Sequence, residues 1–363
     1  MKRLTLLAIL LAVPAHSARA AEPPPAMTPE AAFDGLAKYD YGQDDAALGV
    51  LRLHVARFAT DPARGAQVAG RLAAILQKPE TSEAAKGFIL RQLVVVGTEA
   101  QVPLVAAMLD DPKSAELARY TLEAIPGEAS LEALRDALRR LKTPALIGAI
   151  NSLGIRRDAK SVGPLAGLLG GADPQVAAAA AEALGKIGTA EAAAALLKAQ
   201  VPDGAQVALH NARLQCAERL AAAGDAASAT TVYASVWSSK QPAARRVAGL
   251  VGLAKVAGER AAPQVLDTLA SGDPLLAATA ARLAVRLPGA GLTTALVAKL
   301  QKADAAGQVR LLGILAERGD RAAAAAALAR IGAKDEAVRA AAVQAMARLA
   351  DAAVVDQVAS LAA

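Results

Sequence analysis

The chain has 363 residues, a net charge of +6, 54% hydrophobic residues and only 2% aromatic residues. Ordinary globular cores depend on Phe, Tyr and Trp for much of their buried area, so this composition argues against such a core. Alanine is the best helix former, and an interior of Ala, Leu, Val and Ile therefore favours an all-α fold. The single cysteine, Cys216, excludes an internal disulfide.

Residues 1–20 have the pattern of a secretory signal peptide. Lys2 and Arg3 precede the apolar run Leu4–Val13, and Ala18-Arg19-Ala20 is a small-x-small cleavage site. The run is shorter than the ~20 residues of a membrane-spanning helix, and no later uncharged apolar stretch of about 18 residues follows. We therefore expect cleavage after Ala20, a periplasmic or secreted protein, and no membrane insertion after cleavage.

Cleavage of the signal peptide lowers the net charge of the chain. Lys plus Arg falls from 40 to 37 against 34 acidic residues, which leaves a net charge of +3. A charge this small on a long chain does not predict nucleic-acid binding. Residues 21–28, with three consecutive prolines, are expected to form an extended leader. In residues 29–63, the segments Pro29–Lys38 and Asp44–Phe58 are expected to form an N-terminal helical cap.

Residues 64–363 contain an internal repeat of about 31 residues. Asp111-Pro112 and Asp173-Pro174 are 62 residues apart, and so are Asp273-Pro274 and the variant Asp335-Glu336. In the segments that begin at these four aspartates, the eighth, twelfth and fifteenth positions are apolar and share one stripe of a helix. Asp is a preferred N-cap, Pro suits the first turn, and Gly follows the last apolar residue as a stop signal.

Each segment is therefore predicted to be one capped helix, followed by a turn and a second amphipathic helix such as Ala100–Leu109 or Ala190–Lys198. Two helices in about 31 residues cannot bury a core alone, so neighbouring units must stack. The prediction is an α-solenoid of about nine stacked helical hairpins. The units lengthen between Gln206 and Gly258, which we interpret as two irregular hairpins. Ala352–Leu361 is predicted to be the C-terminal capping helix.

The repeat resembles HEAT repeats, especially the short HEAT-like units of bilin lyases. The residues that carry the resemblance are Asp335-Glu336-Ala337-Val338-Arg339-Ala340-Ala341-Ala342, and Asp173 to Gly188 with its ending Ala183-Leu184-Gly185-Lys186-Ile187-Gly188. The stretch from Lys86 to Gly188 also resembles HEAT modules of exported bacterial proteins. The resemblance implies a HEAT/armadillo-like superhelix whose second helices line a concave face. It does not imply a specific function, because the family is defined by packing positions.

The residues offer no catalytic or metal constellation. The mature chain has two histidines, His54 and His210, and no His-Glu-x-x-His or cysteine pair. His210 and Cys216 are six residues apart and are expected to be partly buried structural residues on different faces of one helix. No phosphate-binding glycine loop is present, so we expect no cofactor.

A polar ladder is the first candidate binding feature. The tenth position of the aligned helices is Tyr120, Glu182, Arg282 and Gln344, and the fourteenth is Ala124, Lys186, Arg286 and Arg348. Arg156 and Arg157 follow the equivalent helix of an intervening unit. These positions lie opposite the apolar stripe. They form either a solvated face with pairs such as Glu182–Lys186 or a mildly basic groove for an acidic or extended partner.

Tyr233 and Trp237 are the second candidate feature, because they lie four residues apart on one helix face. They are either packed within the irregular centre or exposed as an anchor for a partner. The main functional prediction is a non-catalytic scaffold of the cell envelope that binds a protein or extended peptide along its concave face. A bilin-lyase-like or other enzyme-accessory protein and a structural spacer are the alternatives.

Overall fold

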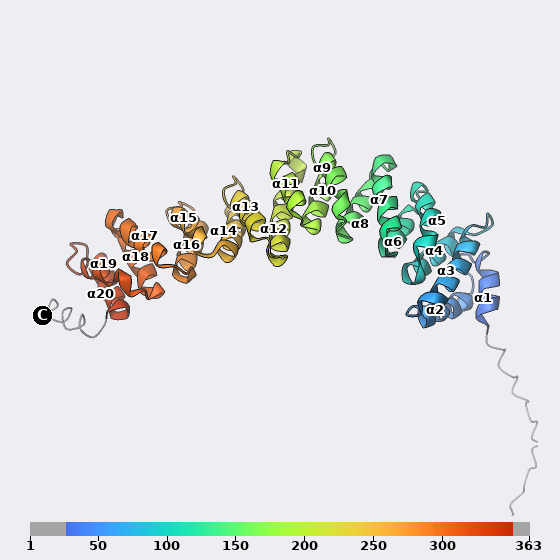
Figure 1. Ribbon diagram of the computed structural model, residues 1–363, viewed down its shortest axis with the longest axis horizontal. Coiled ribbons are helices and arrows are strands. Elements are labelled where there is room, and N and C mark those ends of the chain that lie inside the picture. Colours follow the sequence, from blue (N-terminus) through green and yellow to red (C-terminus); the bar gives the residue numbers. More distant parts are fainter. Residues whose placement is uncertain (1–26, 351–363) are drawn as a thin grey trace, which may run out of the picture.

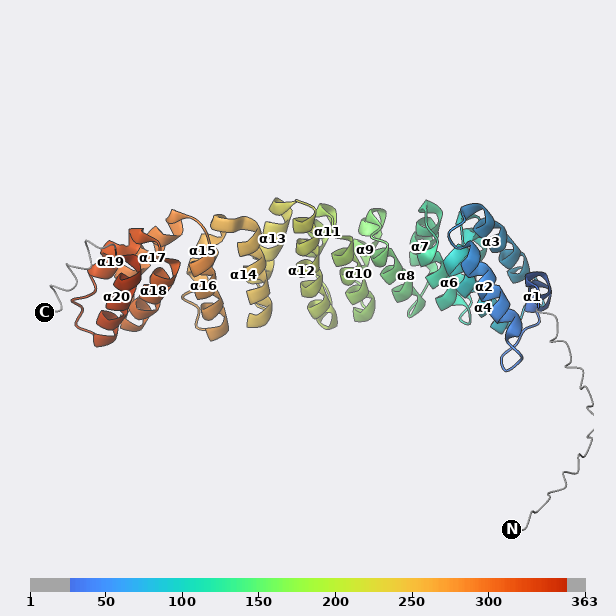
Figure 2. The same ribbon diagram turned by 90° about the horizontal axis from the view of Figure 1, so that it is seen from below.

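The computed structural model describes residues 27–350, and the regular structure of these residues is entirely helical. The helices stack side by side in an elongated, curved array (Figures 1 and 2). The α-solenoid predicted from the repeat is therefore confirmed. The predicted signal peptide, most of the leader at 21–28 and the predicted last helix Ala352–Leu361 lie outside the described residues.

Helices occur in consecutive pairs, and each pair is one hairpin of the stack. The pairs of the first part are α1 (Pro29–Leu36) with α2 (Ala46–Phe58), α3 (Pro62–Leu76) with α4 (Glu83–Val96), α5 (Val102–Ala107) with α6 (Ala115–Ala124), and α7 (Glu128–Arg140) with α8 (Ala145–Ile155). The segments Pro29–Lys38 and Asp44–Phe58 that the sequence analysis singled out are thus the helical pair α1–α2.

The pairs of the second part are α9 (Val162–Leu168) with α10 (Pro174–Ile187), α11 (Ala190–Lys198) with α12 (Gln206–Ala222), α13 (Ala226–Trp237) with α14 (Ala243–Ala257), α15 (Ala262–Thr268) with α16 (Pro274–Arg286), α17 (Ala290–Lys302) with α18 (Ala305–Arg318), and α19 (Ala324–Leu328) with α20 (Glu336–Leu349). Nine pairs therefore run from α3 to α20 in the described chain. Short 3-10 helices η1–η6 flank several of them, at Glu99–Gln101, Met108–Asp110, Ala159–Ser161, Asp203–Ala205, Gly258–Ala261 and Arg321–Ala323.

The aspartates at the repeat starts are helix N-caps, as predicted, in three of the four segments. The helices that they cap are the second members of the pairs given above. Asp173 Oδ1 accepts a hydrogen bond from Gln175 N at 2.8 Å, and Asp273 and Asp335 cap α16 and α20 in the same way. The prediction is wrong at Asp111. Its carboxylate accepts hydrogen bonds from Lys113 N and Ser114 Oγ, so residues 111–114 form a turn and α6 begins only at Ala115.

Successive second helices pack directly on one another from α2 to α12 and again from α14 to α20. Two glycines allow the closest approaches. A Cβ on Gly154 would lie 2.8 Å from the backbone Cα of Ala183, and one on Gly185 would lie 2.9 Å from that of Ala212. These distances are shorter than any real contact, so both positions require glycine for α8, α10 and α12 to stack.

The stack changes at α13. Helix α13 packs against both α12 and α14, while α12 and α14 contact each other only weakly. A Cβ on Gly249 of α14 would lie 2.6 Å from the backbone nitrogen of Trp237, so these two helices touch backbone to backbone. The irregular region 206–258 therefore holds α12 and one complete hairpin, not two hairpins. The reason is that α11, which precedes this region, supplies the first helix of the α12 unit.

Charge is distributed unevenly along the stack. Residues 27–160 contain 17 basic and 17 acidic residues, whereas residues 161–350 contain 20 basic and 14 acidic residues. All ion pairs of the described chain lie between Glu30 and Lys160. The first part is neutral and ion-paired, and the second part is cationic.

Candidate functional site

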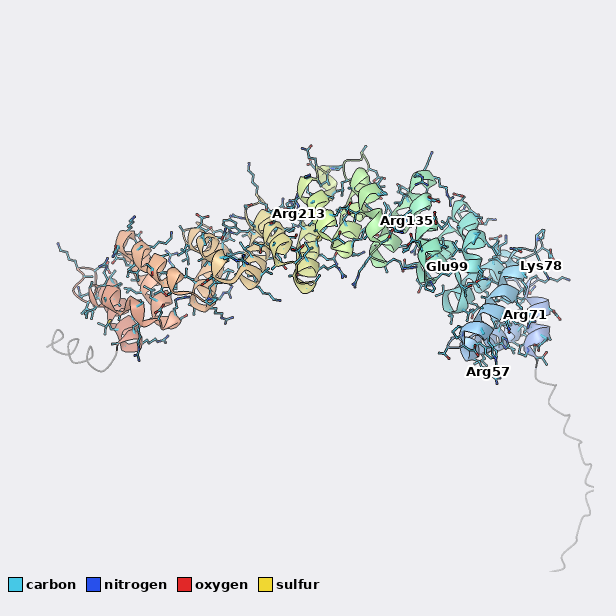
Figure 3. The ribbon with its side chains drawn as sticks, viewed as in Figure 1. Arg57, Arg71, Lys78, Glu99, Arg135 and Arg213 are labelled. Atoms are coloured by element: carbon cyan, nitrogen blue, oxygen red, sulfur yellow. The ribbon has the colours of Figure 1, made fainter. Side chains whose placement is uncertain are left out.

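The candidate site is the concave face of the array. In Figure 1 the second helices α6, α8, α10, α12, α14, α16, α18 and α20 lie below the first helices of their pairs, on the concave side of the arc. The labelled Arg57 of α2 also lies on this side (Figure 3). Each second helix buries one stripe against the first helices and its two neighbours, so its exposed stripe faces the concave solvent.

Six polar residues predicted from the repeat lie on three of these second helices. Glu182, Arg282, Arg286, Gln344 and Arg348 are exposed, and Lys186 is half-buried. Glu182 and Lys186, one turn apart on α10, do not form an ion pair in the structure. The structure adds Lys255, which is exposed at the end of α14. The irregular spacing around α14 hid this lysine from the sequence alignment.

The predicted binding role of Arg156 is not supported, because its guanidinium is engaged inside the stack. Nη1 donates hydrogen bonds to the carbonyl oxygens of Ile125 at 2.7 Å and Glu123 at 3.0 Å, and Nη2 donates to that of Gly127 at 3.2 Å. These carbonyls lie at the end of α6, where they have no partner within the helix, and those of Ile125 and Gly127 also accept a hydrogen bond from Ser130 Oγ. Arg156 therefore holds α8 to the end of α6.

Arg157 is exposed directly after Arg156, with φ at 53°. Gly188 and Gly319 occupy the corresponding left-handed position after α10 and α18, with φ of 67° and 68°. A residue with a Cβ is disfavoured there by about 1–2 kcal/mol.

We expect Arg157→Gly to raise the free energy of unfolding of the surrounding repeats by about 1 kcal/mol, because glycine adopts this conformation without steric cost. Hydrogen exchange of the α8 amides measures the local effect. Arg157→Ala is the control and should give no gain. Equal protection in the Gly and Ala variants would contradict the strain at this position.

Tyr233 and Trp237 do not form an exposed anchor. Tyr233 is only 6% exposed, because its ring lies directly against Gly252 of α14, where a side chain would collide with it. Trp237 is half-buried, and its Nε1 donates a hydrogen bond to Thr268 Oγ1 at 2.9 Å. Both residues join α13 to the following helices, which is the packing alternative considered for them.

Exposed large apolar side chains are the feature that the sequence analysis missed. Within residues 27–350 they occur on second helices, except Met27 before α1 and Tyr41 between α1 and α2, and on none of the first helices. Three of them lie on neighbouring second helices, namely Val95 of α4 (51% exposed), Tyr120 of α6 (47%) and Ile155 of α8 (54%). We call these three residues the apolar ladder. Leu53, Val207, Val251, Leu275 and Val343 are the others on second helices.

The comparisons with known proteins agree with this geometry. Residues 131–211, from α7 into α12, match the family model of HEAT repeats. Residues 131–211 of the chain are therefore HEAT repeats. No curated protein matches the sequence.

Several solved structures resemble this chain at low identity. Human deoxyhypusine hydroxylase is 19% identical with a TM-score of 0.31, covering 69% of this chain and 96% of its own. A mutant of Kap121p is 13% identical with a TM-score of 0.43, covering 90% of this chain and 46% of its own. A chain from a structure concerned with the phosphorylation switch between cadherin and beta-catenin is 13% identical with a TM-score of 0.35, covering 89% and 86%.

Cys216 and His210 of α12, a thiol and an imidazole that could carry chemistry, are both buried. Burial raises the pKa of the Cys216 thiol to about 11, which leaves it protonated and unreactive at neutral pH. Burial, together with Arg213 and Arg245, lowers the pKa of His210, a neighbour on the same helix. In the described ranges of the chain, His, Cys, Asp and Glu form no group that could hold a metal ion. None of the described helices is long and apolar enough to cross a membrane.

Proposed function

We propose that this protein is a non-catalytic scaffold that binds an extended segment of a partner protein along its concave face. The observation that carries the proposal is the placement of the exposed large apolar side chains on second helices. Single exposed apolar residues are normal on any protein surface. Their concentration on second helices, and their absence from the first helices of the described chain, is unusual and supports a surface that contacts another molecule.

The apolar ladder supplies the anchor. Val95, Tyr120 and Ile155 follow one another on adjacent second helices, whose axes in packed arrays are about 8–10 Å apart. A segment lying across α4, α6 and α8 would cover all three side chains. Tyrosine suits such a contact because its ring is apolar and its hydroxyl keeps a polar partner.

The second part of the face contributes charge. Lys186, Lys255, Arg286 and Arg348 lie near the ends of α10, α14, α16 and α20. Glu218 and Glu317 on the intervening helices α12 and α18 interrupt this series without forming ion pairs with it in the described chain. The partner segment is therefore expected to be apolar where it meets α4–α8 and acidic where it meets α14–α20. Such charges mainly set orientation and association rate.

The predicted leader at 1–20 extends the proposal to the compartment. A protein cleaved after Ala20 would meet its partner in the periplasm or outside the cell. Photocrosslinking in the envelope fraction tests partner and compartment together. A photoreactive phenylalanine analogue at Tyr120, and separately at Ile155, is expected to crosslink to the same protein, and the mass of the crosslinked chain should show Ala21 as its N-terminus.

Glu132 of α7 provides the matched control, because it is exposed on the first helix of the same hairpin as Ile155. The analogue at Glu132 should give no adduct with that protein. Once the protein and its partner are purified, their affinity can be measured directly. The double variant Tyr120→Asp/Ile155→Asp should weaken binding about 100-fold, as expected when two buried anchors lose about 1–2 kcal/mol each. Equal crosslinking from Glu132 and Tyr120, or unchanged affinity of the folded double variant, would refute the concave face as the binding surface.

A further inference from the structure

Pockets recur at one edge of the stack, where the end of a first helix meets the next repeat. One pocket of about 460 Å³ lies between Leu109 and Asp110 after α5, Arg119 of α6, and Arg140 and Leu141 at the end of α7. A second, of about 420 Å³, lies between Leu269 and Ala270 after α15, the end of α17 and the first half of α18. Both are within the size range of small-molecule sites.

The first pocket neutralises its own charges. Arg140 forms an ion pair with Asp110, and Arg119 forms one with Glu116 at 2.5 Å. All four side chains line the pocket. A charged ligand would have to compete with these internal pairs, which leave Lys142 as the one unpaired cation among the described residues that line this pocket.

The second pocket lacks this compensation. Lys299 and Lys302 of α17 and Arg310 of α18 line it, and no acidic residue does. None of the three cations forms an ion pair in the described chain. Asp304, the acidic residue nearest to them in the sequence, is turned to the start of α18, where its Oδ1 accepts a hydrogen bond from Gly307 N at 2.8 Å.

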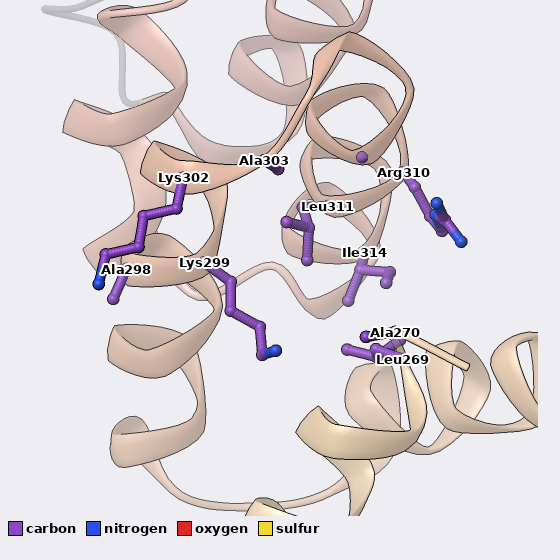
Figure 4. A pocket seen from close by; sticks show the side chains of 10 residues that line it. Leu269, Ala270, Ala298, Lys299, Lys302, Ala303, Arg310, Leu311 and Ile314 are labelled. Atoms are coloured by element: carbon purple, nitrogen blue, oxygen red, sulfur yellow. The ribbon is translucent and has the colours of Figure 1, made fainter. Parts of the chain in front are cut away.

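The walls of the second pocket are apolar. Leu269, Leu311 and Ile314 are each less than 9% exposed, yet they line the pocket together with Ala270 and Ala298. Figure 4 shows the Lys299 side chain reaching into the space beside Leu269 and Ala270, with Leu311 and Ile314 on the opposite wall. Lys302 and Arg310 lie on the two flanks, and their side chains are directed away from the Lys299 ammonium.

We propose that this second pocket binds an apolar chain that ends in a carboxylate. The apolar part would lie against Leu269, Leu311 and Ile314, and the carboxylate would face Lys299 with Lys302 and Arg310 nearby. A neutral chain would leave the three cations without a counter-charge, and a cationic chain would be repelled by them. The pocket is on the edge of the stack, so this inference does not depend on the proposed role of the concave face.

Calorimetric titration of the mature full-length chain with decanoate, below its micelle concentration, tests the proposal. One equivalent of decanoate should bind. Decanol and decyltrimethylammonium should bind at least about ten-fold more weakly, because each exposed ion pair contributes up to about 1 kcal/mol. Acetate, which lacks the chain, should not bind. Equal affinity for decanol and decanoate would overturn the proposal.

Ala270→Asp is the sharpest variant, because it places an acid where the first pocket has Asp110. It should weaken decanoate binding about ten-fold while leaving the exposed helix end folded. Lys299→Gln/Arg310→Gln should have a similar effect, and Lys198→Gln/Lys240→Gln, exposed and outside the pocket, should have none. Unchanged binding in folded Ala270→Asp protein would refute the site. Competition by a short apolar peptide with a free C-terminal carboxylate, but not by its amide, would assign the natural ligand to a protein terminus. Its failure to compete would assign the ligand to a free fatty acid.

Discussion

Replacing Arg318 by leucine is expected to lower the free energy of unfolding by about 3 kcal/mol. The guanidinium of Arg318, in α18, donates hydrogen bonds to the carbonyl oxygens of Ala284 (2.7 Å), Leu287 (2.5 Å) and Gly289 (2.7 Å). Nε also donates to Thr293 Oγ1 at 2.8 Å. The variant would leave the last carbonyls of α16 without partners in a partly buried place, and each charged hydrogen bond is worth roughly 1.5–3 kcal/mol.

Arg156 holds α8 to the end of α6 by the same contacts, so Arg156→Leu should have a similar effect in the first part of the chain. Arg318→Lys should lose an intermediate amount, because an ammonium cannot reach three separate carbonyls as a planar guanidinium does. Arg286→Leu is the control, since Arg286 is exposed and forms no hydrogen bond in the described residues. Chemical denaturation measures all four variants. Equal midpoints for Arg318→Leu and Arg286→Leu would show that the contact adds nothing.

The second large effect is expected at Gly249, where α13 and α14 touch. In Gly249→Ala the added Cβ would lie 2.6 Å from Trp237 N and 2.9 Å from the carbonyl oxygen of Tyr233. Both are backbone atoms, so relief requires the helices to separate and to lose packing around the buried Tyr233. We expect a loss of about 2–3 kcal/mol, typical of overpacking against a rigid neighbour.

Gly313→Ala is a matched control for Gly249→Ala. Gly313 is exposed in the middle of α18, and a Cβ there would meet nothing within 4 Å. Because alanine favours helix more than glycine, this variant should gain about 1 kcal/mol. Thermal unfolding followed by circular dichroism should thus shift in opposite directions for the two substitutions. A shift in the same direction would mean that the α13–α14 contact is looser than the structure indicates.

Local capping signals made the regular helices predictable. Asp173-Pro174 and Asp273-Pro274 fix the first turns of α10 and α16 through contacts within three residues, and α11 begins and ends as predicted at Ala190 and Lys198. The signal failed at Asp111, because the carboxylate of Asp111 accepts a hydrogen bond from the Ser114 hydroxyl instead. It also failed in the centre, because the position of α13 depends on glycines of α14 that lie more than ten residues away.

The candidate site was harder to predict for the same reason. Periodicity placed Arg282 and Arg286 on the exposed stripe of α16, where the structure has them. It could not distinguish Arg156 from these residues, because the carbonyls that Arg156 contacts lie about 31 residues earlier. Sequence alone could not separate Ile155 and Val95 from core residues, since an apolar side chain at the edge of a stripe has the same sequence signal whether it is buried or exposed.

The placement of α13 has a consequence for any ligand that follows the concave face. Elsewhere each second helix packs directly on the next, but between α12 and α14 the direct contact is weak and α13 packs against both, which interrupts the regular row of second helices. The side chains of a regularly repeating bound segment would therefore no longer align with the second helices on both sides of this step. The matching ligand would therefore consist of two contact blocks joined by a spacer, and the length of that spacer would select among ligands whose blocks are otherwise alike.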